Sequence, residues 1–237
     1  MGNNYFQFRQ FKIEQDRCAM KVSTDACIQG AWTPTSSAIK TALDIGAGTG
    51  LLSLMLAQRN DIVKIDAIEI DQSAAKQATE NIATSPWRDR ITVVEADVRH
   101  HAFAKKYDLI ICNPPFFINS LLSDRAARNL ARHNLALSYQ DLFDVIKANL
   151  DQLGYASVLL PSAEHKIWKS LVESNKWRIS RELQIIPRVG QAANRVVSLC
   201  MADHTSEITE EALVIRDHTD RYTQEFRELL SPFYLSV

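Results

Sequence analysis

Short apolar runs alternate with longer amphipathic stretches along the first half of the chain. Four runs have the length and the β-branched or aliphatic character of buried strands: Thr41–Ile45, Ile62–Ile68, Ile91–Val94 and Tyr107–Ile111. Between them, apolar residues recur at helical spacing over Leu51–Leu56 and over Gln72–Thr84. Apolar strands separated by amphipathic helices indicate βαβ units, in which a parallel sheet is covered by helices on both faces.

The same alternation continues to residue 201. It predicts a helix near 139–150, a turn at Gly154, a strand over Tyr155–Leu160, a helix to about 174, and two last strands over Arg178–Ile186 and Arg195–Met201. We therefore predict an α/β fold with one mostly parallel sheet of seven strands and helices on both faces.

Three segments lie outside this pattern. Residues 1–35 precede the first core strand, and Phe6 and Phe8 alternate there as in a short strand. Residues 117–138 are polar and predict a loop with a short helix. Residues 203–237 form an acidic extension that ends in the amphipathic stretch Tyr222–Leu230. With no flexible linker in the sequence, we predict one domain over 1–237, whose core is 36–202.

Glycine is scarce, and its placement suggests a ligand site. Three of the seven glycines fall at 46, 48 and 50, in a turn that joins the first core strand to its helix. The spacing G-x-G-x-G differs from the G-x-G-x-x-G of dinucleotide sites. Asp44 precedes the turn and would repel a pyrophosphate, but suits a ligand with a positive amino group. We therefore predict S-adenosylmethionine as cofactor, bound by Asp44, Gly46, Ala47, Gly48 and Gly50.

Acidic residues follow the next two strands. Glu69 ends the second strand, where a carboxylate can accept both hydroxyls of a ribose. Asp97 follows the third strand and can accept the adenine amino group, and we add the neighbours Ile70 and Val98 to the predicted cofactor site. The alternative for each acid is a solvated carboxylate at a strand end. Asp71 is expected to be the N-cap of the next helix.

The tetrapeptide Asn113-Pro114-Pro115-Phe116 follows the fourth strand, and we predict that it is catalytic. Because ligands lie outside the carboxyl ends of such strands, it should face the same crevice as the glycine turn. The Asn113 side-chain oxygen and the Pro114 carbonyl could both accept hydrogen bonds from one exocyclic NH₂ group. Phe116 offers a flat face on which a base can stack.

Together these motifs resemble the class I, Rossmann-like methyltransferases that modify exocyclic or amide nitrogens. The blocks Cys18–Asp25, Gly30-Ala31-Trp32 and Ser85–Ile91 further resemble the bacterial valine-tRNA adenine N6-methyltransferases, a likeness that covers most of residues 5–202. The resemblance implies methylation of the anticodon-loop adenine immediately 3′ of the anticodon. It also implies that the segment Lys21–Asp25 covers the methionine end of the cofactor, with Lys21 and Thr24 binding it. Thr24 and Asp25 could instead cap the following helix.

Other functions stay open. The resembling family more often has Tyr where this chain has Phe116, and Phe also occurs in rRNA guanine N2-methyltransferases. A release-factor glutamine N5-methyltransferase and a cofactor-binding module without turnover are further alternatives.

The distribution of charge along the chain suggests where RNA could bind. The net charge is −1, so contact with a nucleic acid requires a local patch. Residues 164–195 hold seven basic and three acidic residues, whereas residues from 203 on hold eight acidic and three basic ones. We predict tRNA contacts for Arg125, Arg128, Arg132, Arg188 and Arg195. The alternative is that these side chains form solvated faces.

The remaining features suggest a cytoplasmic protein. Apolar runs are shorter than a bilayer requires, and the N-terminus has no signal-like apolar region. The four cysteines lack metal-ligand and redox spacing, so we expect reduced, mostly buried thiols. His100 and His101 are expected to lie in a solvated turn, and no metal site is predicted. The sequence does not predict an oligomeric state.

Overall fold

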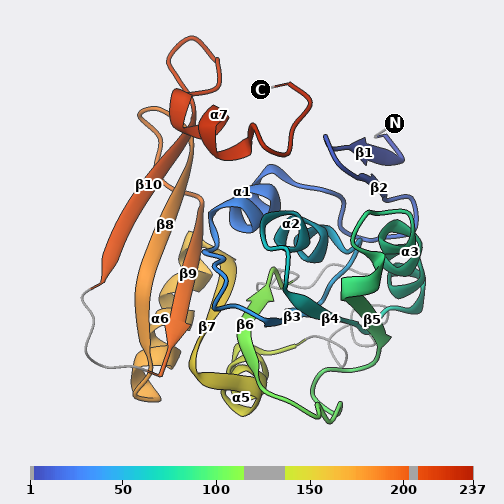
Figure 1. Ribbon diagram of the computed structural model, residues 1–237. Coiled ribbons are helices and arrows are strands. Elements are labelled where there is room, and N and C mark those ends of the chain that lie inside the picture. Colours follow the sequence, from blue (N-terminus) through green and yellow to red (C-terminus); the bar gives the residue numbers. More distant parts are fainter. Residues whose placement is uncertain (1–2, 115–136, 203–207, 237) are drawn as a thin grey trace, which may run out of the picture.

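Figure 1 shows the computed structural model, which describes residues 3–114, 137–202 and 208–236. Its main sheet has eight strands in the order β10-β8-β9-β7-β6-β3-β4-β5 within these ranges. The strands are β3 (Thr41–Ile45), β4 (Lys64–Glu69), β5 (Ile91–Glu95), β6 (Tyr107–Cys112), β7 (Leu150–Pro161), β8 (Arg178–Arg188), β9 (Arg195–Met201) and β10 (Thr209–Arg216). A separate antiparallel pair consists of β1 (Tyr5–Gln7) and β2 (Lys12–Glu14).

The helices cover both faces of the main sheet. They are α1 (Thr24–Trp32), α2 (Leu51–Arg59), α3 (Gln72–Ala83), α5 (Tyr139–Asn149), α6 (Ser162–Ser174) and α7 (Gln224–Leu230), with a 3₁₀ turn over Arg88–Arg90. In the part of the chain that the structure describes, no helix is long and apolar enough to cross a membrane.

Strand direction brings the functional segments to one edge. Within the described sheet, β9 alone runs antiparallel to its neighbours. The other strands all end at the same edge, which we call the carboxyl edge. The segments that follow β3, β4, β5 and β6 therefore meet there, as the sequence pattern predicts.

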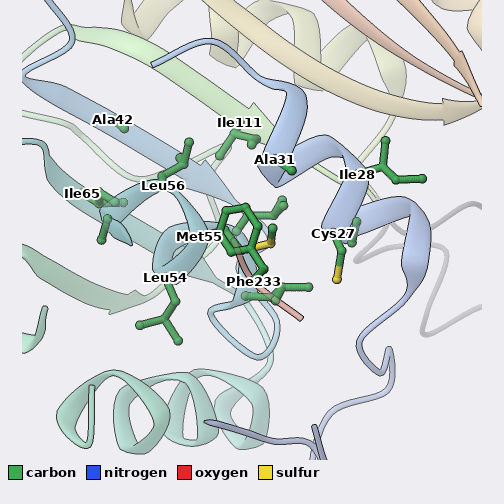
Figure 2. Close-up of a cluster of buried hydrophobic side chains, with 14 of the residues drawn as sticks. Cys27, Ile28, Ala31, Ala42, Leu54, Met55, Leu56, Ile65, Ile111 and Phe233 are labelled. Carbon is green, nitrogen blue, oxygen red and sulfur yellow. The ribbon is translucent and has the colours of Figure 1, made fainter. Parts of the chain in front are cut away.

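Alternation along the strands builds two apolar layers. On β6, Leu109 and Ile111 join the buried cluster that includes α1, α2 and α7, whereas Ile110 and Cys112 join the cluster that includes α5 and α6. Successive strand side chains point to opposite faces, so one run of apolar residues serves both layers. Figure 2 shows part of the first cluster, where side chains of α1 and α2 meet the sheet and Phe233 of the C-terminal segment.

Local sequence signals set the helix starts. The Asp71 side chain accepts a hydrogen bond from the Ala74 N–H at 2.8 Å, so its predicted role as N-cap of α3 is confirmed. At α1 the alternative considered for Thr24 and Asp25, that they cap the helix, is wrong: Ser23 is the N-cap, and Thr24 and Asp25 lie in the first turn. Ser23 has the extended backbone that an N-cap requires, with its Oγ accepting from the Ala26 N–H at 3.2 Å.

The predicted α/β fold is confirmed, with one strand more than expected. The eighth strand, β10, lies in the segment interpreted as an acidic extension and pairs in parallel with β8. Of its residues, Leu213 alone is fully buried, because β10 is an edge strand whose faces are only partly covered. Its sequence therefore lacks the continuous apolar run that marks the inner strands.

The turn predicted at Gly154 is also wrong, because Gly154 lies within strand β7, which runs from Leu150 to Pro161. The β6–β7 register shifts between Tyr107 and Leu109, and Gly154 lies against this irregularity. A Cβ atom at Gly154 would come within 2.8 Å of the Asp108 carbonyl oxygen and 3.0 Å of the Tyr107 carbonyl oxygen. The glycine is thus required by a close approach of two strands.

We predict that Gly154→Ala lowers the free energy of unfolding by about 1–3 kcal/mol, because the added methyl group overpacks against main-chain oxygens that cannot rotate away. Leu153→Ala is the control: Leu153 is 88% exposed, so its effect should stay within about 0.5 kcal/mol. Urea unfolding monitored by circular dichroism measures both. Equal stability of the two variants would contradict the argument.

A buried carboxylate links α6 to β8. Glu182 is 5% exposed, and its Oε1 lies 3.3 Å from His165 Nε2 and 2.8 Å from Lys169 Nζ. His165 and Lys169 hold the pKa of Glu182 at about 2, below the ordinary 4.5. A carboxyl group with a depressed pKa in the folded state stabilises the fold above its unfolded pKa and loses that contribution as pH falls.

We therefore expect Glu182→Gln to destabilise the protein at pH 6, and the gap to wild type to narrow as pH falls from about 4.5 towards 2. Urea titrations at pH 6 and at pH 3.5 measure the two gaps. Glu173→Gln, at an exposed position of α6, is the matched control and should show no such narrowing.

Candidate active site

A cavity of about 510 Å³ opens at the carboxyl edge of the sheet. Its volume lies in the range of small-molecule sites. The walls come from the glycine turn, from the ends of β4, β5 and β6, from the start of α3, and from the segment Asp16–Met20 near the N-terminus. Segments from separate parts of the sequence thus enclose one space.

The glycine turn forms one wall, through Gly46 and Gly48. Gly46, Gly48 and Gly50 have φ angles of +70°, +55° and +81°, in the region that favours glycine. A Cβ atom at Gly46 would meet nothing within 4 Å, and one at Gly48 only the Gly46 carbonyl oxygen at 3.9 Å. The two cavity-facing glycines therefore leave open space in front of the backbone, where a ligand can approach.

Asp44 lies beneath the turn and does not line the cavity. It is fully buried, and its Oδ2 accepts hydrogen bonds from the Ser53 N–H at 3.1 Å and the Ser53 hydroxyl at 2.7 Å. Burial raises the pKa of Asp44 to about 6, although the hydrogen bonds from Ser53 oppose the shift. Within the described residues its Oδ1 has no partner. Asp44 thus anchors the first turn of α2, and its contact with a ligand amino group stays a prediction.

Glu69 connects the turn to the next helix. Its Oε2 accepts the Gly48 N–H at 2.8 Å and its Oε1 accepts the Asp71 N–H at 2.9 Å. Glu69 lines the cavity, and each of its oxygens keeps a further lone pair for a ligand hydroxyl. The neighbouring Ile70 and Val98 also line the cavity and give it apolar surface.

Asp97 lines the cavity in a pair with Arg99, which sequence reasoning missed. The Arg99 Nε and Nη2 donate to the two Asp97 oxygens at 2.6–3.0 Å, and the Arg99 backbone N–H donates at 2.9 Å. These hydrogen bonds lower the pKa of Asp97 and keep it ionised. The sequence signal that could have indicated this pair is an acidic residue followed two positions later by an arginine.

Asn113 directly follows β6 and also lines the cavity, together with Pro114. The Asn113 Oδ1 is buried and has no hydrogen-bond partner in the described part of the chain. The strand end beneath it is held by Gln29 of α1, whose Nε2 donates to the Cys112 carbonyl at 3.0 Å and to the Ser157 carbonyl at 3.2 Å. An unpaired buried acceptor is costly unless a ligand supplies the donor.

Several predicted residues are not on the cavity wall. Lys21, Thr24, Ala47 and Gly50 do not line it. Lys21 Nζ lies 3.4 Å from the Asn3 carbonyl oxygen, and Gly50 is the N-cap of α2. From this part of the chain, Asp16–Met20 line the cavity instead. Cys18–Met20 belong to a block that resembles the family, but the sequence predicted no cofactor contact for them. Pro115, Phe116, Arg125, Arg128 and Arg132 lie outside the described residues.

The two predicted arginines of the β8–β9 region lie at the carboxyl edge. Arg188 ends β8 and forms an ion pair with Asp220, and Arg195 begins β9, with its Nε 3.5 Å from Asp25 Oδ2. The basic segment 164–195 is not one patch, however. Arg178 pairs in register with Met201 at the opposite edge, and Lys169 binds the buried Glu182.

Two of the four cysteines, Cys18 and Cys112, line the cavity. Cys18 lines it, and burial together with the Glu69 and Asp71 carboxylates raises the pKa of its thiol to about 11. Cys27, Cys112 and Cys200 are buried, as expected. Within the described ranges, no group of three or more His, Cys, Asp or Glu side chains could hold a metal ion.

Known proteins were compared with this chain. The sequence matches the family described as "Methyltransferase small domain" over residues 33–151. A tRNA1(Val) (adenine(37)-N6)-methyltransferase of Tolumonas auensis is 44% identical, covering 100% of this chain and 99% of that relative. A relative of the same name in Dyadobacter fermentans is 41% identical, covering 98% of each chain.

Solved structures show the same fold. A predicted O-methyltransferase from Agrobacterium tumefaciens matches with a TM-score of 0.70 at 20% identity, covering 88% of this chain and 96% of that one. A glycopeptide N-methyltransferase complexed with S-adenosyl-L-methionine matches with a TM-score of 0.54 at 16% identity, covering 78% and 97%. Fold, site and sequence likeness agree: the chain belongs to the methyltransferase small-domain family and, within it, to the tRNA1(Val) (adenine(37)-N6)-methyltransferases.

Proposed function

We propose that this enzyme transfers a methyl group from S-adenosylmethionine to the exocyclic N6 of adenine 37 of tRNA1(Val). The observation that carries the proposal is the buried Oδ1 of Asn113, which has no hydrogen-bond partner among residues 3–114, 137–202 and 208–236 and lies in the same cavity as the glycine turn and Glu69. A hydrogen-bond acceptor that would suit an amino group and a glycine turn that would suit a nucleoside thus line one cavity. The names of the full-length relatives support adenine 37 as the target.

The residues of the cavity suit this cofactor. The open backbone at Gly46 and Gly48 would admit it closely, and Glu69 would accept its ribose hydroxyls. Ile70 and Val98 would flank the flat adenine, while Asp97, ionised beside Arg99, would accept from the adenine amino group. When bound, S-adenosylmethionine supplies a methyl group on a sulfonium centre that becomes a thioether once the methyl carbon leaves.

Asn113 would prepare the target nitrogen. Its Oδ1 and the Pro114 carbonyl would each accept one N6 hydrogen, which turns the nitrogen lone pair out of conjugation with the ring. On transfer, the new N–C bond would form as the C–S bond of the cofactor breaks, and the surplus N6 proton would pass to water. Because the amine becomes acidic on methylation, no strong base is required, and catalysis comes mainly from positioning. An unpaired anticodon-loop base also enters the cavity at a lower cost than a paired one.

The target base would stack on the Phe116 ring as it enters. Arg125, Arg128 and Arg132, which follow this motif in sequence, are proposed to contact the tRNA backbone, as are Arg188 and Arg195 at the carboxyl edge. Phosphate contacts of this kind fix the RNA in position without reading its sequence.

The direct test uses transcripts of tRNA1(Val) with the purified protein and S-adenosylmethionine. Nucleoside mass spectrometry should detect N6-methyladenosine in the wild-type transcript and none when adenine 37 is replaced by guanine. Methylation of rRNA or of a release factor in place of this tRNA would support one of the alternative substrates. Cofactor binding without transfer to any of them would indicate a binding module.

We expect Asn113→Ala to lower kcat by more than about a hundredfold, because a positioned hydrogen-bond partner at the reacting group is lost. The dissociation constant for S-adenosylhomocysteine, measured by calorimetry, should change little. Glu69→Ala should show the reverse profile, with weakened cofactor binding, because its carboxylate holds the Gly48 turn. Turnover of Asn113→Ala within about tenfold of wild type would exclude Asn113 as the group that holds the amine.

Removing Arg188 and Arg195 together should weaken tRNA binding and flatten its salt dependence, with the slope of log K against log salt falling by about one to two. Fluorescence anisotropy over a range of salt concentrations measures the slope. Lys176→Ala removes an exposed charge from the turn between α6 and β8, at the opposite edge, and should leave the slope unchanged. A slope insensitive to both arginines would place the RNA elsewhere.

A further inference from the structure

The wall formed by Asp16–Met20 comes from the N-terminal segment and not from the sheet. Figure 1 shows this segment, with β1 and β2, beside α3 at the end of the sheet. Gln15 closes the base of the loop: its Oε1 accepts the Val22 N–H at 2.9 Å and its Nε2 donates to the Asn3 carbonyl at 2.9 Å. These two hydrogen bonds fix the base of the loop within the N-terminal segment. They do not connect the loop to the glycine turn, so other contacts must set the distance between the loop and that turn.

Gln77 of α3 fixes the loop on one side. Its side chain is fully buried. The Gln77 Oε1 accepts the Arg17 N–H at 3.1 Å, and its Nε2 donates to the Asp16 carboxylate at 2.6 Å. The oxygen and the nitrogen of this amide therefore each bind one of two adjacent residues of the cavity wall.

Asn81, one helical turn later, fixes the loop to the glycine turn. It is 2% exposed, with its Oδ1 accepting the Glu14 N–H at 2.9 Å. Its Nδ2 donates to the Glu14 carbonyl and to the Thr49 carbonyl, both at 2.9 Å. Thr49 lies between Gly48 and Gly50, so one amide joins the base of the N-terminal loop to the turn that faces the ligand.

Packing of α3 against the N-terminal segment does not by itself require the hydrogen bonds of Gln77 and Asn81. Burying two amides on one helix face is costly unless each is hydrogen-bonded, and apolar side chains would fill the same space. Residues at i and i+4 lie on the same side of a helix, which here faces the N-terminal segment. Glu80, on the adjoining surface, adds an ion pair with Arg17.

We propose that Gln77 and Asn81 are positioning residues that hold the Asp16–Met20 wall at the distance from the glycine turn that cofactor binding needs. The inference rests on the proposed function, since it takes S-adenosylmethionine as the occupant. It assigns to α3 a second role besides covering the sheet.

The test compares binding of S-adenosylhomocysteine to the full-length protein by calorimetry. Gln77→Glu keeps the acceptor for the Arg17 N–H but sets a carboxylate against Asp16. We expect the dissociation constant to rise by about tenfold or more, because two carboxylates would face each other where the buried Gln77 amide now donates to Asp16. The KM for S-adenosylmethionine should rise in parallel, while the KM for tRNA stays within about twofold, a split that a general loss of stability would not give.

Rescue separates positioning from structure. In the double variant Asp16→Asn with Gln77→Glu, the hydrogen bond can form with its polarity reversed, so affinity should return to within about threefold of Asp16→Asn alone. Gln72→Met is the matched control, because Gln72 is an exposed amide on the same helix and should leave affinity unchanged.

The outcomes are distinct. If wild type binds no S-adenosylhomocysteine, the proposed function is wrong. If wild type binds it and Gln77→Glu binds equally well, or the double variant shows no rescue, the positioning role is wrong. If Gln77→Glu does not fold, hydrogen exchange on wild type decides: the Glu14 and Arg17 amides should gain protection with S-adenosylhomocysteine, and unchanged exchange would overturn the inference.

Discussion

The Glu69 carboxylate is the contact on which the geometry of the cavity depends. One of its oxygens holds the Gly48 N–H of the glycine turn, and the other holds the Asp71 N–H at the start of α3. The turn that follows β3 and the helix that follows β4 are thereby fixed to each other across the carboxyl edge. Because α3 also carries Gln77 and Asn81, the same contact sets where the N-terminal wall can lie. A charge-assisted pair of hydrogen bonds to backbone N–H groups is strong enough to order such a turn.

The Asn113 side of the cavity has a different origin. Asn113 is placed by the end of β6, and that end is held from beneath by the buried amide of Gln29. Helix α1 therefore contributes to the site without reaching the cavity. Rigid support of this kind is what a reaction driven by positioning requires, since small displacements of the reacting groups lower its rate steeply.

The sheet continues well beyond the site. Strands β8, β9 and β10 extend it on the side of β7, and the C-terminal α7 packs on the same layer as α1 and α2. Their ends bring Arg188 and Arg195 to the edge that carries the cavity. The carboxyl edge thus carries both the cavity and these two arginines.

The order of strands and helices, the glycine turn and the N-cap at Asp71 followed from the sequence, because periodicity, positive φ angles and capping are local properties. Strand β10 did not, since an edge strand buries too little to show an apolar run. Tertiary structure decided the Asp16–Met20 wall, the burial of Asp44, the pairing of Asp97 with Arg99, and the lack of a partner for Asn113 Oδ1 among the described residues. Asp97 and Arg99 are only two positions apart in the sequence. The other features depend on contacts between distant segments, and most of the residue pairs involved lie tens of positions apart.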